Sequence, residues 1–403
     1  RLALPHASDE LSAHPTDAPG PPDVASADLD LADTPVPWYS PLESPWVPSV
    51  PAACSAGEFP HLRSGCRPAG LRTCADLFRE ADGVCLPRLA ECPPDTRADT
   101  LAGCVTFPDD DAPLEPTDVV AELTVAGLEA ALSATTVGAR VRVGAASLTG
   151  PGPLPIARSL TLRGAGATQT RLGPVSVANG LAVVLEHVTL SDVSLDAGSS
   201  LTLNDVQVTG TIRFVEQTAL RASRSRIAAR AGEEPVVAAP FGGFVELYDS
   251  TVSGARWEHN RGRLLAARSI IELDGDLNQP GSVDIADSAV LTGSGIRQWG
   301  SGAGRVLRSA LVATSGAVFT TVVELQEASV AVEDCLIRGP SGLVDAAFVS
   351  RRNVFDGITE VGLRGRVTSS DDTFRVTSGT AVVGYLPLIS DLYLVHADVP
   401  NET

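Results

Sequence analysis

The sequence predicts an all-β protein built mainly as a right-handed parallel β-helix, a solenoid of short strands that stack coil upon coil. Three observations lead to this prediction. From about residue 140 onward, short Val, Leu and Ile runs alternate with Gly, Ser, Asp and Arg. These runs recur at steps of roughly 20 residues, which suits one coil of two or three strands. Six cysteines fall in one short stretch ahead of the repeat.

Residues 1–53 are rich in Pro, Asp, Ala and Ser, and few of their apolar residues repeat at any period. Such a composition cannot bury enough apolar surface to offset chain entropy, so we expect a disordered acidic tether. The sequence contains no Met, even at position 1. We therefore expect the chain to begin after its natural start. Removal of an export signal would explain this, and so would trimming of the chain.

Residues 54–107 are expected to form a small Cys-rich module, in which cross-links replace a hydrophobic core. A dense, even cysteine cluster usually forms disulfides in an oxidising compartment, whereas a zinc site typically needs closer Cys-x-x-Cys pairs. The connectivity stays open, since six cysteines allow fifteen pairings. Residues 108–116 (PDDDAPLEP) then predict a polar linker. The expected disulfide-forming residues are Cys54, Cys66, Cys74, Cys85, Cys92 and Cys104.

Residues 117–403 are assigned to the β-helix, which begins with a helical stretch. Val125 and Leu128 start an apolar stripe at helical spacing, Thr124 is a suitable N-cap, and Gly138 would end the helix. We expect this short amphipathic helix to cover the open end of the solenoid core and to block edge-to-edge strand pairing.

Each coil of the repeat aligns on one charged position, with an apolar residue usually four positions before it and another three positions after it. The step is 18 residues from His187 to Asp205 (205 − 187) and 26 from Arg308 to Asp334 (334 − 308). A propeller blade would be longer, and a leucine-rich repeat would need a Leu-rich consensus with a recurrent Asn or Cys. Parallel strands stack about 4.8 Å apart, so equivalent residues should form straight columns.

The charged column alternates in sign along the chain. Like charges stacked at strand spacing repel and opposite charges attract, so alternation lets each acid lie between two bases. We expect a ladder of inter-coil ion pairs that fixes coil register, each pair worth about 0.2–1 kcal/mol. The interleaved arginines argue against Ca²⁺ binding. The expected members are Asp205, Arg224, Asp249, Arg268, Asp287, Arg308, Asp334, Arg352 and Asp371.

The column after the charged one is a run of serines interrupted by Cys335. We expect Cys335 to be a structural free thiol that replaces one serine. A nucleophilic cysteine needs an activating base, and no His lies nearby in the sequence. The serines are Ser225, Ser250, Ser269, Ser288 and Ser309.

The formal net charge of −19 argues against nucleic acid and anionic membrane surfaces as partners. All of the basic side chains are arginines, since the sequence has no Lys. No apolar run approaches the roughly 18–20 residues of a membrane span, so no transmembrane segment is expected. The cysteine cluster favours a secreted or cell-surface protein, either extracellular or an outer-membrane lipoprotein. The oligomeric state stays open.

The expected helix, the strand region RVRVGAASLTGPGPLPI, the motif SLTLRGAGATQTRL and the coils together resemble the pectin-lyase-like superfamily of right-handed parallel β-helices. The resemblance covers roughly residues 117–395. The Cys-rich stretch GCRPAGLRTCADLF is similar to small segments of exported myxobacterial proteins. The superfamily includes pectate lyases, polygalacturonases, phage tail spikes and adhesins, so the resemblance implies a fold and not an activity.

The catalytic motifs of these enzymes do not carry over, so we predict no catalytic residue, no metal site and no cofactor. No His lies between glycines, and the chain has no Lys. The Arg-x-Pro-x-x-Arg stretch of pectate lyases has its nearest counterpart at Arg338-Gly-Pro340-Ser-Gly-Leu343, where the second Arg is missing. A pair of facing carboxylates from different coils stays open.

The best remaining candidate for ligand contact is the stretch RWEHNRGR, where an indole could stack on a sugar while a guanidinium binds an anionic group. A solvated loop is the alternative. The sequence thus favours an exported non-enzymatic surface or binding protein with glycans or surface proteins as partners. The alternatives are a polysaccharide lyase or glycoside hydrolase with an unrecognised site, and an oligomeric fibre or spike component. The candidate contact residues are Trp257, Glu258, His259, Arg261 and Arg263.

Overall fold

The computed structural model divides the chain into two units, Arg1–Pro48 and Ser49–Thr403, and every described residue belongs to the second. The expected tether, residues 1–53, lies outside the described residues. The described residues are 54, 58–61, 65–80, 84–229, 235–239, 242–259, 262–278, 281–299, 303–322, 329–344, 347–357, 360–361, 367–370, 372–376, 382–383, 388–390 and 393–396.

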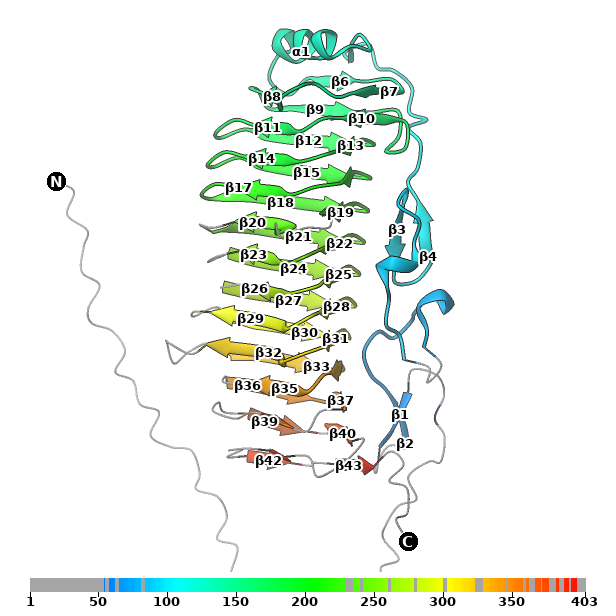
Figure 1. The fold of residues 1–403 in the computed structure, drawn as a ribbon, viewed down its shortest axis with the longest axis vertical. Coiled ribbons are helices and arrows are strands. Elements are labelled where there is room, and N and C mark those ends of the chain that lie inside the picture. Colours follow the sequence, from blue (N-terminus) through cyan, green and yellow to red (C-terminus); the bar gives the residue numbers. More distant parts are fainter. Residues whose placement is uncertain are drawn as a thin grey trace, which may run out of the picture. The chain divides into compact units, whose positions relative to one another are not determined.

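The main body is a parallel β-helix, as the sequence predicts, with three parallel sheets running along its coils (Figure 1). Within the described residues, sheet A has 14 strands, sheet B 13 and sheet C 10. Sheet A consists of β5 (Val119–Val120), β6 (Arg140–Arg142), β9 (Leu160–Arg163), β12 (Ala182–Glu186), β15 (Ser200–Asn204), β18 (Thr218–Ser223), β21 (Gly243–Tyr248), β24 (Gly262–Ala267), β27 (Gly281–Ala286), β30 (Gly304–Leu307), β33 (Ser329–Glu333), β36 (Ala347–Arg351), β39 (Val367–Ser370) and β42 (Leu388–Ser390).

Sheets B and C complete each coil. Sheet B consists of β7 (Ala146–Leu148), β10 (Thr170–Leu172), β13 (Thr189–Leu190), β16 (Gln207–Val208), β19 (Arg226–Ala228), β22 (Thr251–Gly254), β25 (Ile270–Leu273), β28 (Ala289–Thr292), β31 (Ala310–Ala313), β34 (Leu336–Arg338), β37 (Val354–Asp356), β40 (Thr373–Val376) and β43 (Tyr393–His396). Sheet C consists of β8 (Leu154–Ile156), β11 (Val175–Val177), β14 (Val193–Leu195), β17 (Ile212–Phe214), β20 (Val237–Ala239), β23 (Trp257–His259), β26 (Asp276–Asn278), β29 (Gly295–Trp299), β32 (Ala317–Val322) and β35 (Ser341–Val344). β38 (Glu360–Val361) and β41 (Val382–Val383) pair separately.

The interior is the continuous apolar column that the repeat predicts. Residues on each strand alternate between the core and the outer face, because side chains of a strand point to opposite faces in turn. The positions three residues after the charged one are buried in this core, which confirms the stacked repeat. They are Leu190, Val208, Ile227, Val252, Ile271, Val290, Leu311, Ile337, Phe355 and Phe374.

The charged position is the residue at which the chain turns from sheet A to sheet B. It has a left-handed backbone, with φ between 43° at Arg308 and 54° at Asp205 and Asp334. Non-glycine residues adopt this conformation at a cost of about 1–2 kcal/mol. The residues with this turn are His187, Asp205, Arg224, Asp249, Arg268, Asp287, Arg308, Asp334 and Arg352.

Helix α1 (Val125–Ala134) lies over the first coil (Figure 1). The Thr124 hydroxyl accepts a hydrogen bond of 3.0 Å from the Gly127 amide, as its predicted N-cap role requires, and Leu128 is buried in the solenoid core. The helix ends at Ala134, before the predicted stop at Gly138. Thr135 already has an extended backbone with ψ of 154°, and its hydroxyl donates to the Leu132 carbonyl.

The six clustered cysteines pair in sequence order, as Cys54–Cys66, Cys74–Cys85 and Cys92–Cys104. Each disulfide closes a loop of 11 or 12 residues, which stabilises a chain by about 2–3 kcal/mol in the entropic account. The elements of this region are β1 (Glu58–His61), β2 (Gly65–Pro68), η1 (Asp76–Phe78), η2 (Leu89–Glu91), β3 (Thr96–Asp99) and β4 (Gly103–Thr106).

A comparison of Arg268→Val with Arg268→Gly separates the backbone strain at this turn from the loss of the ion pair between Arg268 and Asp249. Both variants lose the side chain, but only Val adds steric strain at φ 48°. We expect the Val variant to have a free energy of unfolding about 1–2 kcal/mol below that of the Gly variant in urea titrations.

Arg263 supplies the control, because it lies within strand β24, where β-branched residues are favoured over glycine. At this position the Val variant should be the more stable of the two. The same order at both positions would contradict a left-handed turn at Arg268.

Candidate functional site

The disulfide-bonded region is joined to the β-helix along its length. We call residues 65–80 and 84–112 the strap. It runs along sheet B in the direction opposite to the growth of the coils, and Figure 1 shows β3 and β4 beside them. Near one end of the strap the Gly70 amide donates to the Asp334 carbonyl at 3.0 Å, and near the other the Asp110 amide donates to the Ala165 carbonyl at 2.8 Å. The strap therefore connects coils that are far apart in the solenoid.

Apolar packing holds the first half of the strap. Leu71 and Leu86 pack on outward-facing residues of sheet B, and Phe78 and Leu89 pack on Ile270 of β25. Gly70 has φ of +73°, and a Cβ at this position would lie 3.0 Å from the Leu336 Cβ, so only glycine suits the close approach. The outward-facing residues of sheet B in contact with the strap are Ala289, Ala310, Leu336 and Val354.

Polar contacts hold the same interface in register. Glu80 forms a 2.9 Å ion pair with Arg338, and the Leu89 amide donates to the Glu272 carboxylate at 2.7 Å. Further along, Arg226 donates to the carbonyls of the strap residues Pro93 and Thr96, each at 2.7 Å. Arg97 donates to the Asp249 carbonyl at 3.2 Å.

Asp110 is the anchor at the end of the strap. Its carboxylate has no exposed surface and lies 2.5 Å from Arg163 and 2.8 Å from Arg142. Burial raises the pKa of Asp110, but the hydrogen bonds from Arg163 and the Ala112 amide and the two guanidinium charges outweigh it, so the net pKa is lowered. The expected linker 108–116 is thus tied to the first coils of the solenoid.

The charged column contains four bidentate Asp–Arg pairs between adjacent coils, with hydrogen bonds of 2.6–2.9 Å. Each arginine binds the aspartate of the coil before it. Hydrogen bonding to Asp205, together with the charges of Asp205 and of Asp249 in the next coil, raises the pKa of Arg224. Asp371 lies outside the described residues. The pairs are Asp205–Arg224, Asp249–Arg268, Asp287–Arg308 and Asp334–Arg352.

The serine column lies inside the solenoid and bonds one coil to the next. The Ser250 amide donates to the Ser269 hydroxyl at 3.2 Å, and that hydroxyl donates to the Ala267 carbonyl at 2.9 Å. Cys335 makes the matching contact, since its thiol lies 3.1 Å from the Glu333 carbonyl. Burial raises the pKa of Cys335 to about 12. A thiol so resistant to ionisation is a poor nucleophile.

In the stretch RWEHNRGR, Trp257 to His259 form strand β23 and β24 begins at Gly262, so these described residues lie in strands and not in a loop. The Trp257 side chain is completely buried in the core, so its indole cannot stack on a surface ligand, contrary to the sequence-based interpretation. Strand alternation turns it inward, in register with the buried Val237 and Leu277.

The other candidate contacts with described side chains, Glu258 and Arg263, pair with different partners. Glu258 lies 3.0 Å from Arg256, and Arg263 lies 2.8 Å from Asp284. Arg261 and the side chain of His259 lie outside the described residues. Arg263 remains an exposed side chain on the outer face of sheet A.

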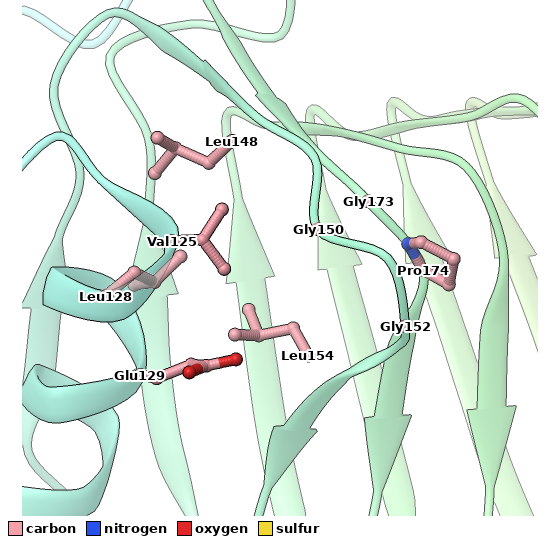
Figure 2. Close-up of a pocket in the computed structure, with 9 residues that line it drawn as sticks. All are labelled: Val125, Leu128, Glu129, Leu148, Gly150, Gly152, Leu154, Gly173 and Pro174. Atoms are coloured by element: carbon pink, nitrogen blue, oxygen red, sulfur yellow. The ribbon is translucent and has the colours of Figure 1, made fainter.

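A small pocket opens beside α1, where the helix meets the loops before β8 and β11 (Figure 2). Val125, Leu128, Leu148 and Leu154 line it with apolar side chains, and Glu129 adds one carboxylate. Within the described part of the chain, no cluster of three or more His, Cys, Asp or Glu side chains could hold a metal ion. None of the described helices is long and apolar enough to cross a membrane.

The chain matches no protein-family model, no curated protein and no solved structure. The resemblance to the pectin-lyase-like superfamily therefore rests on the residues quoted above. Sequence reasoning missed the docking of the strap, although a signal was present. The positions two residues after the charged one should face outward, yet from Ile270 to Val354 they are apolar.

Substitution of Cys335 by Ser should change the free energy of unfolding by less than about 1 kcal/mol, because the hydroxyl keeps the bond to the Glu333 carbonyl. Val at this position should cost about 1–2 kcal/mol, because it removes the side chain that accepts from the Ser309 amide inside the solenoid. The native thiol should not react with a disulfide reagent at pH 8.

The raised pKa of Cys335 also sets a pH dependence. The folded state holds the neutral thiol, so its contribution is complete below the unfolded pKa of about 9 and is lost as the pH rises toward 12. Wild type should therefore lose stability relative to the Ser variant over this range. A constant difference would contradict the burial of the thiol.

Substitution of Asp110 by Asn should cost about 3 kcal/mol at pH 7, because it leaves the largely buried Arg142 without this carboxylate and leaves Arg163 with the more distant Glu186 at 3.3 Å. The pKa of Asp110 is lowered, so this stabilisation is present above the ordinary value near 3.8 and is lost as the pH falls through the folded value. The exposed neighbour Asp111 is the control, and Asp111→Asn should leave the urea midpoint unchanged.

Proposed function

We propose that the chain is an exported, non-enzymatic surface or binding protein whose pectin-lyase-like β-helix is a rigid scaffold for contacts with glycans or proteins. The strap is the observation that carries this proposal. Solenoid repeats normally contact only their neighbours. A strap that joins Asp334 to Ala165 braces coils that do not touch, and its disulfides suit an oxidising compartment.

The carboxylates of the outer faces favour binding over catalysis. Glycoside hydrolysis needs one carboxyl group with a raised pKa and a second that is free to act as base or nucleophile. A carboxylate that already pairs with a guanidinium is not free for either role. Sheets A and C hold their acids in such pairs, including Glu246–Arg221, Asp284–Arg263 and Asp276–Arg297.

The glycan contact is assigned to the outer face of sheet A. Phe244 is 59% exposed and lies in register with Arg263 on the next strand. Tyr248 lies on the same strand as Phe244, and the guanidinium of Arg221 on the preceding strand, β18, lies 5.3 Å from the centre of its ring. Flat aromatic rings beside guanidinium groups suit the apolar face of a sugar and its anionic substituents.

The test incubates the full chain with a panel of acidic and neutral polysaccharides and measures both retention and turnover. We expect retention of an acidic polysaccharide with no new reducing ends and no unsaturated products. Phe244→Ala should weaken retention at least about fivefold, since an aromatic contact is worth about 1 kcal/mol or more. Val215→Ala, at another exposed apolar position, is the matched control.

Each other outcome contradicts a defined part of the proposal. Steady turnover would establish the enzyme alternative. Retention that Phe244→Ala does not change would exclude this face of sheet A. Absence of retention across the panel would exclude a glycan partner and leave a protein partner for the scaffold.

A further inference from the structure

A column of outward-facing residues runs along the middle of sheet A from β18 to β30. The register of adjacent strands places these residues beside one another, coil by coil. At one end, Arg221 Nε lies 3.0 Å from the Glu246 carboxylate. The aliphatic Leu265 separates this ion pair from the charged residues at the other end. The column consists of Arg221, Glu246, Leu265, Asp284 and Arg305.

Asp284 lies beside two arginines and is paired with one of them. Arg263, on the preceding strand, donates to Asp284 Oδ2 from Nε at 3.0 Å and from Nη2 at 2.8 Å. Arg305 is the direct neighbour of Asp284 on the following strand, yet no carboxylate in the described part of the chain pairs with it. One carboxylate and two guanidinium groups leave a surplus of one positive charge here, on a chain whose formal net charge is −19.

Arg305 is the arginine that can accept an external anion at this place. Its side chain is exposed, and its neighbour in the next coil is Ala331, which has no charge to offer. The other arginines on strands of sheet A within three coils of Phe244 are Arg221 and Arg263, which already hold carboxylates of the protein. An exposed guanidinium suits bidentate binding of a carboxylate or a sulfate group.

The distance from Phe244 to Arg305 sets the size of a ligand that contacts both. Phe244 lies on β21 and Arg305 lies three coils further on, so they are about 14 Å apart along the solenoid axis. The register also offsets them by two residues along the strand, which adds about 7 Å in that direction. A single sugar ring is smaller than this separation, whereas a chain of several sugars can span it.

We propose that the ligand of this face is an anionic polysaccharide that lies along the solenoid axis. One sugar stacks on Phe244, and Arg305 binds a carboxylate or sulfate group of a sugar further along the chain. Arg263 and Asp284 lie between the two contacts and neutralise each other. The assignment rests on the proposed function, to which it adds the direction of the ligand, its charge and the residue that recognises the charge.

The test measures the affinity of the full chain for alginate, which carries carboxylates, for dextran sulfate and for neutral dextran. The two anionic polymers identify the group that Arg305 binds. The main variant is Arg305→Gln. The matched control is Arg171→Gln, which removes one exposed positive charge from β10 in sheet B and so changes the net charge equally on another face.

We expect wild type to bind an anionic polymer at least about tenfold more tightly than dextran. Arg305→Gln should weaken this binding about tenfold, as expected for loss of a charge-assisted hydrogen bond, and Arg171→Gln should leave it unchanged. Asp284→Asn should strengthen it, because the carboxylate beside Arg305 repels the anion. A disaccharide of the same polymer should bind at least about tenfold more weakly than its octasaccharide, because it cannot span both contacts.

Equal affinity for dextran and for the anionic polymers would overturn the proposal. So would an effect of Arg305→Gln no larger than that of Arg171→Gln, weaker binding by Asp284→Asn, or a disaccharide that binds as tightly as the octasaccharide. If Phe244→Ala weakens binding and Arg305→Gln does not, only this inference fails. If neither variant weakens binding, or neither anionic polymer binds, the glycan contact assigned to sheet A fails as well.

Discussion

One hydrogen bond, repeated in coil after coil, sets the geometry of the β-helix. A backbone amide at the turn between sheets A and B donates to the serine hydroxyl of the next coil, as Ser269 does to Ser288 at 3.0 Å. The bond lies in an apolar interior, where an unpaired amide would cost about 1–3 kcal/mol. Satisfying it fixes the stacking of adjacent coils. The left-handed residue before each serine, and the ion pair that this residue makes at the surface, follow from that alignment.

The strap adds a second kind of connection. Contacts within the sheets join each coil to the next, so their energy is a sum over neighbours. The strap instead joins Asp334 to Ala165 through one continuous, internally cross-linked segment. The two parts stabilise each other, because the strap has little core of its own and the apolar outward-facing residues of sheet B are buried by the strap. The Cys-rich region and the β-helix therefore lie in one structural unit.

The fold could be predicted from the sequence because each coil of the solenoid repeats the same pattern of apolar, charged and small polar residues. The apolar positions, the expected helix and the disulfide-bonded region all follow from spacing and composition. The interpretation of Trp257 as a surface contact was wrong, because it relied on the polar residues next to it in the sequence. The alternation of side chains along β23 turns Trp257 into the core instead. The docking of the strap was missed because no local pattern links Leu71 to Leu336. Only the apolar character of outward positions such as Ile270 and Ala310 carried that information.

The direction of the strap has a consequence for the order of assembly. Gly70 is synthesised long before Asp334, whose carbonyl its amide must reach. The surface that receives the strap exists only once coils up to Val354 have stacked. The strap therefore cannot dock until the coils have formed, beginning at the end covered by α1. Its disulfides close loops within the strap itself, so they do not depend on the coils. Docking of the strap is therefore a late step of folding, because it requires that the coils beneath it have already formed.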